Sequence, residues 1–303
     1  MAFGGLTGDY ARMHFDLDFG REAGLGVPIA HGLLGAAWTL GALRQHAPAR
    51  LATGHAGAFV EAFDVRFTHP LQIGDRFALR WSDSAAEPKT LVTDFEAVNQ
   101  SGEVTSRGRV GVRRLENAES WEPAERPAPI EAAADAARWR DDETLYAEDL
   151  LARGPRGVGR GRTVTEADLV AFTNFTGDLD PLTLDDPFAR SGPFGARIAP
   201  AMWTFCRGFG DFLRDLLRAP LPAAGFAGHL GDSWRFLAPV FPGDTLRTRH
   251  APVACTPSKS RPGMAIVSFA LQLENQRGEI VQDGRVAMMV ATRPSAADRS
   301  PGV

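Results

Sequence analysis

The sequence has little cysteine and no long apolar run, and each shortage excludes a class of protein. Cys206 and Cys255 are its only cysteines, too few for a disulfide framework or for a zinc site built from thiolates. The longest mostly apolar stretch, Val27 to Leu43, is shorter than the ~20 apolar residues that a membrane-spanning helix needs. It therefore predicts a buried helix. Because no secretory signal follows Met1, we expect a cytoplasmic protein.

A dense run of basic residues is also missing. The chain has 33 lysines and arginines against 37 aspartates and glutamates, and no cluster that could follow a nucleic-acid backbone. We therefore expect neither a nucleic-acid nor a membrane partner. Hydrophobic residues make up 44% of the chain, which is enough for sizeable cores and excludes disorder as the main state. Residues 116–149 hold 11 acidic residues against three arginines, so the remainder is slightly basic and mildly favours an anionic ligand.

An internal duplication dominates the sequence. At an offset of 169 residues, Thr7-Gly8-Asp9 falls on Thr176-Gly177-Asp178, Ile29-Ala30 falls on Ile198-Ala199, and 11 of the first 35 positions are identical. The offset becomes 176 further along the chain, so seven extra residues lie in the second half, most simply in the loop at 256–263. The chain is therefore predicted to contain two copies of one structural unit.

Each copy has one apolar helix followed by about four segments that alternate apolar and polar residues. This order predicts an α+β fold in which a long helix, starting near Ile29 and near Ile198, packs across a curved antiparallel sheet. We expect the two sheets to pair edge to edge. The predicted division is residues 1–115 and 146–293 for the two repeats, 116–145 for an acidic linker rich in Ala, Pro and Glu, and 294–303 for a disordered tail.

The start of the first copy is shorter than that of the second. Before the Gly-Asp motif, the second copy has a predicted strand at 158–162 and a helix that opens at a capping box, Thr163 to Glu166. Met1 aligns with Val170, inside that helix, so the first repeat lacks its N-terminal strand and most of its first helix. We expect the natural product to begin roughly 25 residues earlier, with its own strand and capped helix.

Two short motifs in the first copy contain residues that could carry out chemistry. Asp9 and His14 lie five residues apart in a turn-like segment, a spacing that can aim a carboxylate and an imidazole at one water. The second copy keeps the aspartate but has Thr183 in place of the histidine. Only the first half can therefore use an imidazole at this position.

The second motif, His31-Gly32, opens the apolar helix. Glycine at this point lets a ligand approach the backbone N–H groups at the positive end of the helix, and such donors can stabilise an oxyanion. The second copy has Pro200 and Ala201 there. The histidines outside these motifs lack obvious partners, so packing or surface roles are expected for His46, His55, His69, His229 and His250.

Both motifs resemble the MaoC-like dehydratase family, also called hydratase 2, of the double-hotdog type. Residues 7–16 are similar to its pattern T-G-D-x-N-P-x-H-x-D, and residues 26–33 to the pattern G-x-x-I-A-H-G-M/L. Ala11 and Arg12 replace the Asn-Pro of the family pattern, which changes how the turn is braced and leaves the substrate open. Otherwise the resemblance extends over nearly all of both halves.

The resemblance implies a hydro-lyase that hydrates trans-2-enoyl-CoA or dehydrates (R)-3-hydroxyacyl-CoA thioesters. It implies that Asp9 and His14 bind the catalytic water as the acid/base pair, and that the Gly32 N–H polarises the thioester carbonyl. No metal and no other cofactor is expected, since the thioester itself acidifies the α-carbon.

Three further residues are predicted to contact the acyl-CoA substrate. His31 would orient the start of the helix, and Arg12 and Arg66 could meet a nucleotide phosphate. Two alternatives remain: a hotdog acyl-CoA thioesterase, and an inactive acyl-CoA-binding or partner subunit. The order of the aspartate and histidine beside the His-Gly helix start favours the hydratase. The sequence leaves the oligomeric state open, with a homodimer as one option.

Overall fold

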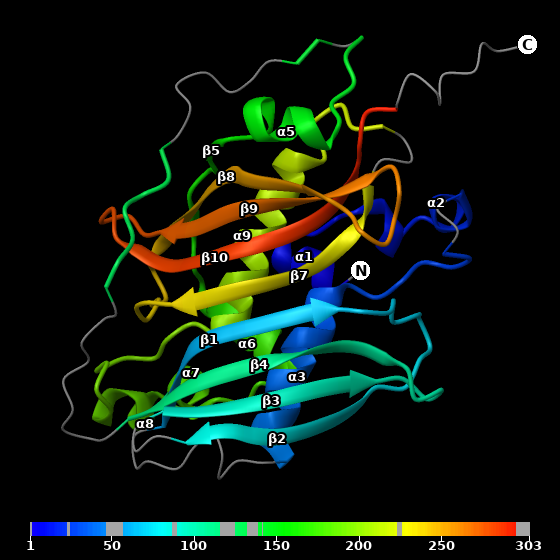
Figure 1. The fold of residues 1–303 in the computed structure, drawn as a ribbon. Coiled ribbons are helices and arrows are strands. Elements are labelled where there is room, and N and C mark those ends of the chain that lie inside the picture. Colours follow the sequence, from blue (N-terminus) through cyan, green and yellow to red (C-terminus); the bar gives the residue numbers. More distant parts are fainter. Residues whose placement is uncertain are drawn as a thin grey trace, which may run out of the picture.

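One continuous antiparallel sheet forms the centre of the protein (Figure 1). The computed structural model describes residues 2–22, 25–46, 57–86, 90–115, 125–131, 139–140, 142–222 and 226–294. The strands of the first half are β1 (Ala58–Phe67), β2 (Ala78–Ala86), β3 (Thr90–Val98) and β4 (Val104–Arg114). Those of the second half are β5 (Gly157–Val158), β6 (Arg162–Thr163), β7 (Phe226–Phe236), β8 (Thr245–Pro257), β9 (Met264–Glu274) and β10 (Ile280–Ala291). They run in the order β2-β3-β4-β1-β7-β10-β9-β8-β5, with β6 also on β8.

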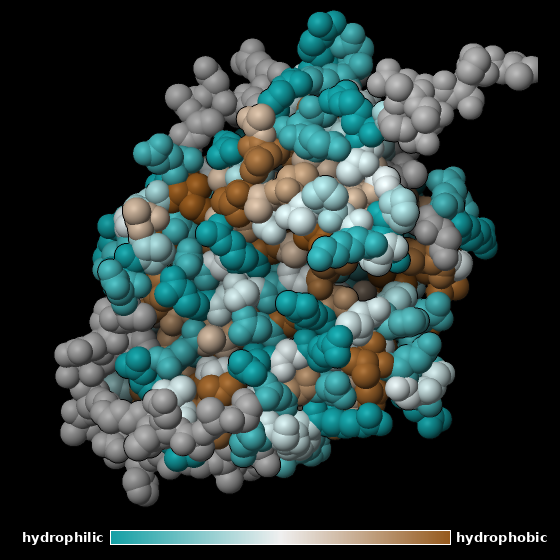
Figure 2. All heavy atoms as spheres, in the orientation of Figure 1, coloured by the Kyte–Doolittle hydropathy of each residue, from teal (hydrophilic) through white to brown (hydrophobic). Residues whose placement is uncertain are grey.

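The helices cover one face of this sheet (Figure 1). The first half contains α1 (Ala2–Thr7), the 3-10 turn η1 (Arg12–His14), α2 (Leu17–Glu22) and the long α3 (Gly32–His46). The second half contains α5 (Ala147–Arg153), α6 (Glu166–Thr176), α7 (Pro181–Leu184), α8 (Asp186–Ser191) and the long α9 (Ala201–Leu216). Large side chains of the two long helices, such as Leu40 and Phe212, are fully buried against the sheet. The opposite face of the sheet shows mostly hydrophilic side chains with smaller apolar areas between them (Figure 2).

The two halves meet at the edge between β1 and β7. These strands pair antiparallel, and Asp64 lies opposite Ser233, its counterpart at the 169-residue offset. The two halves are therefore related by an approximate twofold rotation about the middle of the β1–β7 pair. The predicted edge-to-edge pairing of two helix-plus-sheet units is confirmed, and the arrangement is the double hotdog that the resemblance implies.

Both long helices begin three residues later than predicted. Ile29 forms a β-bridge with Gln72, and the Ala30 N–H donates to the Leu71 carbonyl, so this segment is extended rather than helical. In the second half the Ala199 N–H donates to the Val240 carbonyl in the same way. As a result, α3 starts at Gly32 and its first N–H groups are left free of intrahelical partners.

The first helix of the second half also starts slightly later than predicted. Its N-cap is Thr165, whose side chain accepts from the Asp168 N–H, whereas the sequence motif placed the cap at Thr163. Thr163 instead lies in β6, which pairs with β8. Among the described residues, β2, the counterpart of β8, carries no further strand on its outer side, in agreement with the shorter first repeat.

Part of the acidic connector packs against the second half. The Ile130 N–H donates to the side chain of Gln272 (2.8 Å), which in turn donates to the Ala128 carbonyl (3.1 Å). The division into repeats, linker and tail stays a prediction, and the tail lies outside the described residues apart from Pro294. None of the helices within the described ranges is both long and apolar enough to cross a membrane.

Candidate active site

A tight turn after α1 positions Asp9. The Thr7 hydroxyl donates to the Phe3 carbonyl (2.9 Å), and Gly8 ends the helix at φ +84°, a left-handed conformation that favours glycine. The Ala11 N–H then donates to Asp9 Oδ1 (3.1 Å). This bond braces the turn from one side of the carboxylate and leaves Oδ2 facing His14. The Asp9 side chain is buried.

The His14 ring faces that carboxylate from the 3-10 turn. Its Nδ1 lies 2.9 Å from the Ile29 carbonyl oxygen, which only accepts, so Nδ1 carries the proton when the ring is neutral. Nε2 then presents a lone pair, and it lies 4.0 Å from Asp9 Oδ2. That separation is too long for a direct hydrogen bond and is suited to a third oxygen atom between them. The two motif residues predicted to act together are thus brought together.

His31 supports this pair from the other side. Its ring stacks on the ring of His14, with centroids 3.8 Å apart and planes at 23°, and its Nε2 lies 3.1 Å from the Asp9 carbonyl oxygen. Burial, and next the charge of His14, lower the pKa of His31 to about 4. Burial also lowers the pKa of His14, although Asp9 opposes the effect. Both rings are therefore neutral at pH 7, as a general base must be.

The lowered pKa of His31 predicts a stability loss in mild acid. The unfolded chain takes up a proton at His31 near pH 6.5, whereas the folded protein does so only near pH 4. The stability that depends on a neutral His31 is thus complete above pH 6.5 and is lost as the pH falls toward 4. Between pH 7 and pH 5, the wild-type protein should lose about 2 kcal/mol more unfolding free energy than His31→Gln. Urea unfolding at both pH values measures this, and equal losses in the two proteins would contradict it.

Gly32 lies beside the pair at the first position of α3. A Cβ atom here would lie 2.9–3.1 Å from three carbons of the Phe67 ring, so only glycine keeps both the ring and the helix start in place. Among the described residues, the N–H groups of Gly32 and Leu33 have no backbone acceptor, whereas that of Leu34 donates to the His31 carbonyl (3.0 Å). Both free groups lie at the positive end of the helix dipole. A carbonyl oxygen approaching from the cavity can accept from them.

These residues line a cavity of about 720 Å³ that both halves build. The first half contributes the Asp9 turn, the start of α3 and the residues that follow β1. The second half contributes apolar side chains from α9 and β10, a histidine from β7 and Arg261 from the loop between β8 and β9. The second-half lining residues are Phe209, Leu213, Gly228, His229, Arg261 and Met288. A cavity of this volume is typical of a binding site for a small molecule such as an acyl group, and not of a flat interface with another protein.

Two predicted substrate-binding residues lie elsewhere. Arg12 is exposed and pairs with Asp16 at 2.8 Å, on the outside of the turn. Arg66 is exposed on β1, and neither arginine lines the cavity. Their contact with a nucleotide phosphate stays a prediction. His31 and Gly32, in contrast, do line the cavity.

The second half also supplies residues that sequence reasoning missed. Arg207, on α9, donates to the Thr7 carbonyl (3.0 Å) and so holds the end of the helix that precedes Asp9. His229, expected to pack or lie at the surface, lines the cavity three residues before Asp232. The sequence feature that distinguishes His229 is its alignment with Val60, an apolar residue, in the other copy. Local spacing could not show that both residues face the first-half motif.

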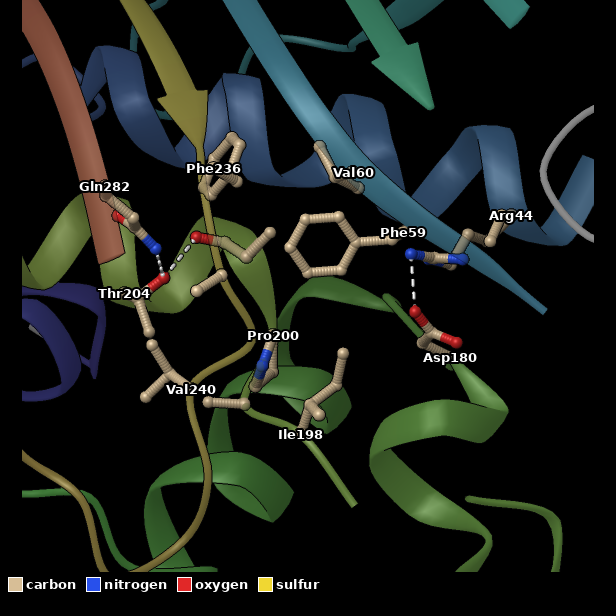
Figure 3. A pocket seen from close by; sticks show the side chains of 14 residues that line it. Arg44, Phe59, Val60, Asp180, Ile198, Pro200, Thr204, Phe236, Val240 and Gln282 are labelled. Atoms are coloured by element: carbon tan, nitrogen blue, oxygen red, sulfur yellow. Dashed lines mark hydrogen bonds and ion pairs between the residues drawn. The ribbon is translucent and has the colours of Figure 1, made fainter. Parts of the chain in front are cut away.

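The equivalent site of the second half is closed by an arginine (Figure 3). Arg44, from α3, forms ion pairs with Asp178 and with Asp180, the latter at 2.6 Å. Burial acts to lower the pKa of Arg44, but the two carboxylates outweigh it and the pKa is raised. The space here is only about 20 Å³. The counterpart of Arg44 in the first-half site is Leu213, which leaves that cavity open.

Asp9, His14 and His31 also form a group with three ligand atoms within 4.8 Å of one another. A metal would need the ring nitrogens to point at one place, and imidazole lone pairs lie in the plane of the ring. The stacked rings instead hold their lone pairs side by side. One nitrogen of each ring also contacts a backbone carbonyl. We therefore assign no metal to this group.

Comparisons with known proteins show the family and the fold of the chain. A family model described as "MaoC like domain" matches residues 1–105 and 153–267. A 3-hydroxybutyryl-CoA dehydratase of Methylorubrum extorquens is 28% identical over 152 residues, which cover 50% of this chain and 88% of that protein. An (R)-specific enoyl-CoA hydratase of Rhodospirillum rubrum is 27% identical over 154 residues, which cover 50% of this chain and 97% of that protein. A Mycobacterium tuberculosis protein described as a double hotdog fold superposes with a TM-score of 0.63 at 16% identity, covering 95% of this chain and 90% of that one.

Proposed function

Because the chain belongs to the MaoC-like domain family, we propose that it is a hydro-lyase that acts on acyl-CoA thioesters. It adds water to trans-2-enoyl-CoA or removes water from (R)-3-hydroxyacyl-CoA. The names of its relatives, a dehydratase and a hydratase of acyl-CoA substrates, support this class of reaction. The observation that carries the proposal is the gap between His14 Nε2 and Asp9 Oδ2, in the cavity of about 720 Å³ and beside the free N–H groups at the start of α3.

In the hydration direction, a water molecule sits in this gap. It donates one hydrogen bond to the Asp9 carboxylate and one to His14 Nε2, which is unprotonated because Nδ1 bonds the Ile29 carbonyl. His14 takes a proton from the water as its oxygen bonds to C3 of the substrate. The electron pair of the C2–C3 double bond moves toward the thioester carbonyl and forms an enolate.

The enolate oxygen is stabilised by the N–H groups at the start of α3, including that of Gly32, and by the helix dipole. His14, now an imidazolium beside Asp9, then returns its proton to C2 of the substrate. One hydrogen and one hydroxyl have been added, and the enzyme is back in its starting state. Dehydration follows the same steps in reverse. Every group in this scheme belongs to the first half, while the second half contributes one wall of the cavity.

The expected result of a direct assay is loss of the enoyl-thioester absorbance when the protein is mixed with crotonyl-CoA, with 3-hydroxybutyryl-CoA as the product. A thiol reagent added in parallel distinguishes the thioesterase, because cleavage of the thioester releases free coenzyme A whereas hydration does not. Release of thiol without loss of the double bond would contradict the proposal. Binding of the thioester without any turnover would indicate the inactive acyl-CoA-binding subunit.

A further inference from the structure

A second histidine–aspartate pair lies on the wall of the cavity that the second half provides. His229 Nε2 is 2.7 Å from Asp232 Oδ2, and the Asp232 side chain is fully buried. The His229 ring is held between two aromatic rings: Phe209 stacks on it at 4.5 Å and 18°, and Phe67 contacts it at 4.9 Å. Its Nδ1 has no hydrogen-bond partner among the residues that the structure describes. The mechanism above uses neither residue of this pair.

The duplication shows that this pair is specific to the open site. At the 169-residue offset, Val60 aligns with His229 and Phe63 aligns with Asp232. The two strands also match in shape, because β1 has a bulge one residue after Val60 and β7 has one a single residue after His229. Val60 lines the closed counterpart site (Figure 3). An apolar pair therefore fits this position in the fold. The polar pair occurs on the wall that faces Asp9, and that wall belongs to the other half of the chain.

The location of His229 fits the acyl chain rather than the reacting atoms. The Phe67 ring that contacts His229 also packs directly on Gly32, where the thioester carbonyl is proposed to bind. Phe209, Leu213 and Met288 on this wall are apolar, and Arg261 contributes a charged side chain from the loop between β8 and β9. A plain alkyl chain would gain nothing from an imidazole here. Burying a carboxylate and an imidazole costs free energy unless both are paired, so an alkyl chain would be better served by valine.

We propose that His229, held in place by Asp232, is a specificity-determining residue that binds a hydroxyl group on the acyl chain. This assignment rests on the proposed hydratase function. The Asp232 carboxylate holds a proton on Nε2, so Nδ1 presents a lone pair and accepts a hydrogen bond from a hydroxyl group close to C4 of the acyl group. The preferred substrates are then short 2-enoyl or 3-hydroxyacyl thioesters with a hydroxyl substituent, rather than unbranched alkyl thioesters.

Three thioesters that differ only at C4 test this proposal: crotonyl-CoA, with a methyl group, 4-hydroxycrotonyl-CoA and 3-carboxyacryloyl-CoA. In the wild-type protein, 4-hydroxycrotonyl-CoA should have a kcat/KM at least about tenfold above that of crotonyl-CoA, whereas 3-carboxyacryloyl-CoA, whose ionised carboxylate has no hydrogen to donate, should gain nothing from His229. His229→Val, which introduces the residue of the other half, should reduce that preference at least about tenfold. Asp232→Asn should reduce it as well, because Asp232 positions the ring. A preference for the carboxylate thioester that His229→Val removes would contradict the acceptor role of Nδ1.

Val60→Ala is the matched control, since it changes the equivalent position in the closed site, and it should leave the preference within about twofold. If His229→Val lowers kcat/KM equally for all three thioesters, or for none of them, the preference is unchanged and the assignment is overturned. If that variant does not fold, the wild-type comparison still decides, because equal kcat/KM for all three thioesters contradicts the proposal. Hydration of none of the three would overturn the proposed function itself, and the specificity assignment with it.

Discussion

Replacing His14 with alanine should reduce the kcat for enoyl-CoA hydration by about 10²- to 10⁴-fold, the usual contribution of a positioned acid/base group. The variant removes the nitrogen that faces Asp9 Oδ2 across the 4.0 Å gap. The neighbouring His31 cannot take over, because its Nε2 contacts the Asp9 carbonyl oxygen and burial lowers its pKa to about 4. Steady-state kinetics on crotonyl-CoA, with circular dichroism to check the fold, measures the effect.

Thr183→Ala is the control for this variant, because Thr183 is the counterpart of His14 in the closed site. Thr183 is buried, and among the described residues its hydroxyl has no hydrogen-bond partner. Its removal should leave turnover nearly intact. Asp9→Asn should resemble His14→Ala, since Oδ1 can still accept from the Ala11 N–H while the charge beside the imidazolium is lost. Comparable losses from Thr183→Ala and His14→Ala would show that the two halves share the chemistry.

The duplication made most of the fold predictable from the sequence. Conserved spacing of the Gly-Asp turns placed the helix and strands of one half on those of the other, and the pairing of β1 with β7 follows from that symmetry. Helix starts were less predictable. Pro28 and Ile29 looked like the beginning of an apolar helix, but a bridge to Gln72 keeps Ile29 extended. Long-range pairing of this kind leaves no trace in local periodicity.

The candidate site was predictable only where it lies in two short motifs of the first half. Asp9 and His14 are five residues apart, and their partnership could be read from spacing. Two contacts that sequence spacing could not show come from more than 190 residues away: Arg207 holds the Thr7 carbonyl, and His229 lines the cavity. Their role depends on how the two repeats pack on each other. The lowered pKa of His31 has a similar origin, since it comes from burial and from stacking on His14.

The packing of one repeat on the other gives the second large expected effect. Gly210, on α9, lies against the turn that carries Asp9: a Cβ atom there would overlap the Thr7 carbonyl oxygen and lie 3.0 Å from the Asp9 nitrogen. Both neighbours are backbone atoms, so the turn has to move. A displacement of about 1 Å at a catalytic group can cost about 10²-fold in rate. Gly210→Ala should therefore lower kcat about 10²-fold and destabilise the fold by about 1–3 kcal/mol through overpacking.

Gly41 provides the control, because the duplication places it at the same position on α3. A Cβ atom at Gly41 would overlap the Thr176 carbonyl oxygen and lie 3.0 Å from the Asp178 nitrogen, in the turn of the closed site. Gly41→Ala should destabilise the fold by a similar amount, about 1–3 kcal/mol, because the clash is the same. It should leave kcat nearly unchanged, because the displaced turn carries no catalytic group. Urea unfolding and crotonyl-CoA kinetics on both variants separate the two effects. If both variants lose kcat in proportion to their loss of stability, the cause is general loosening of the fold and not the displacement of Asp9.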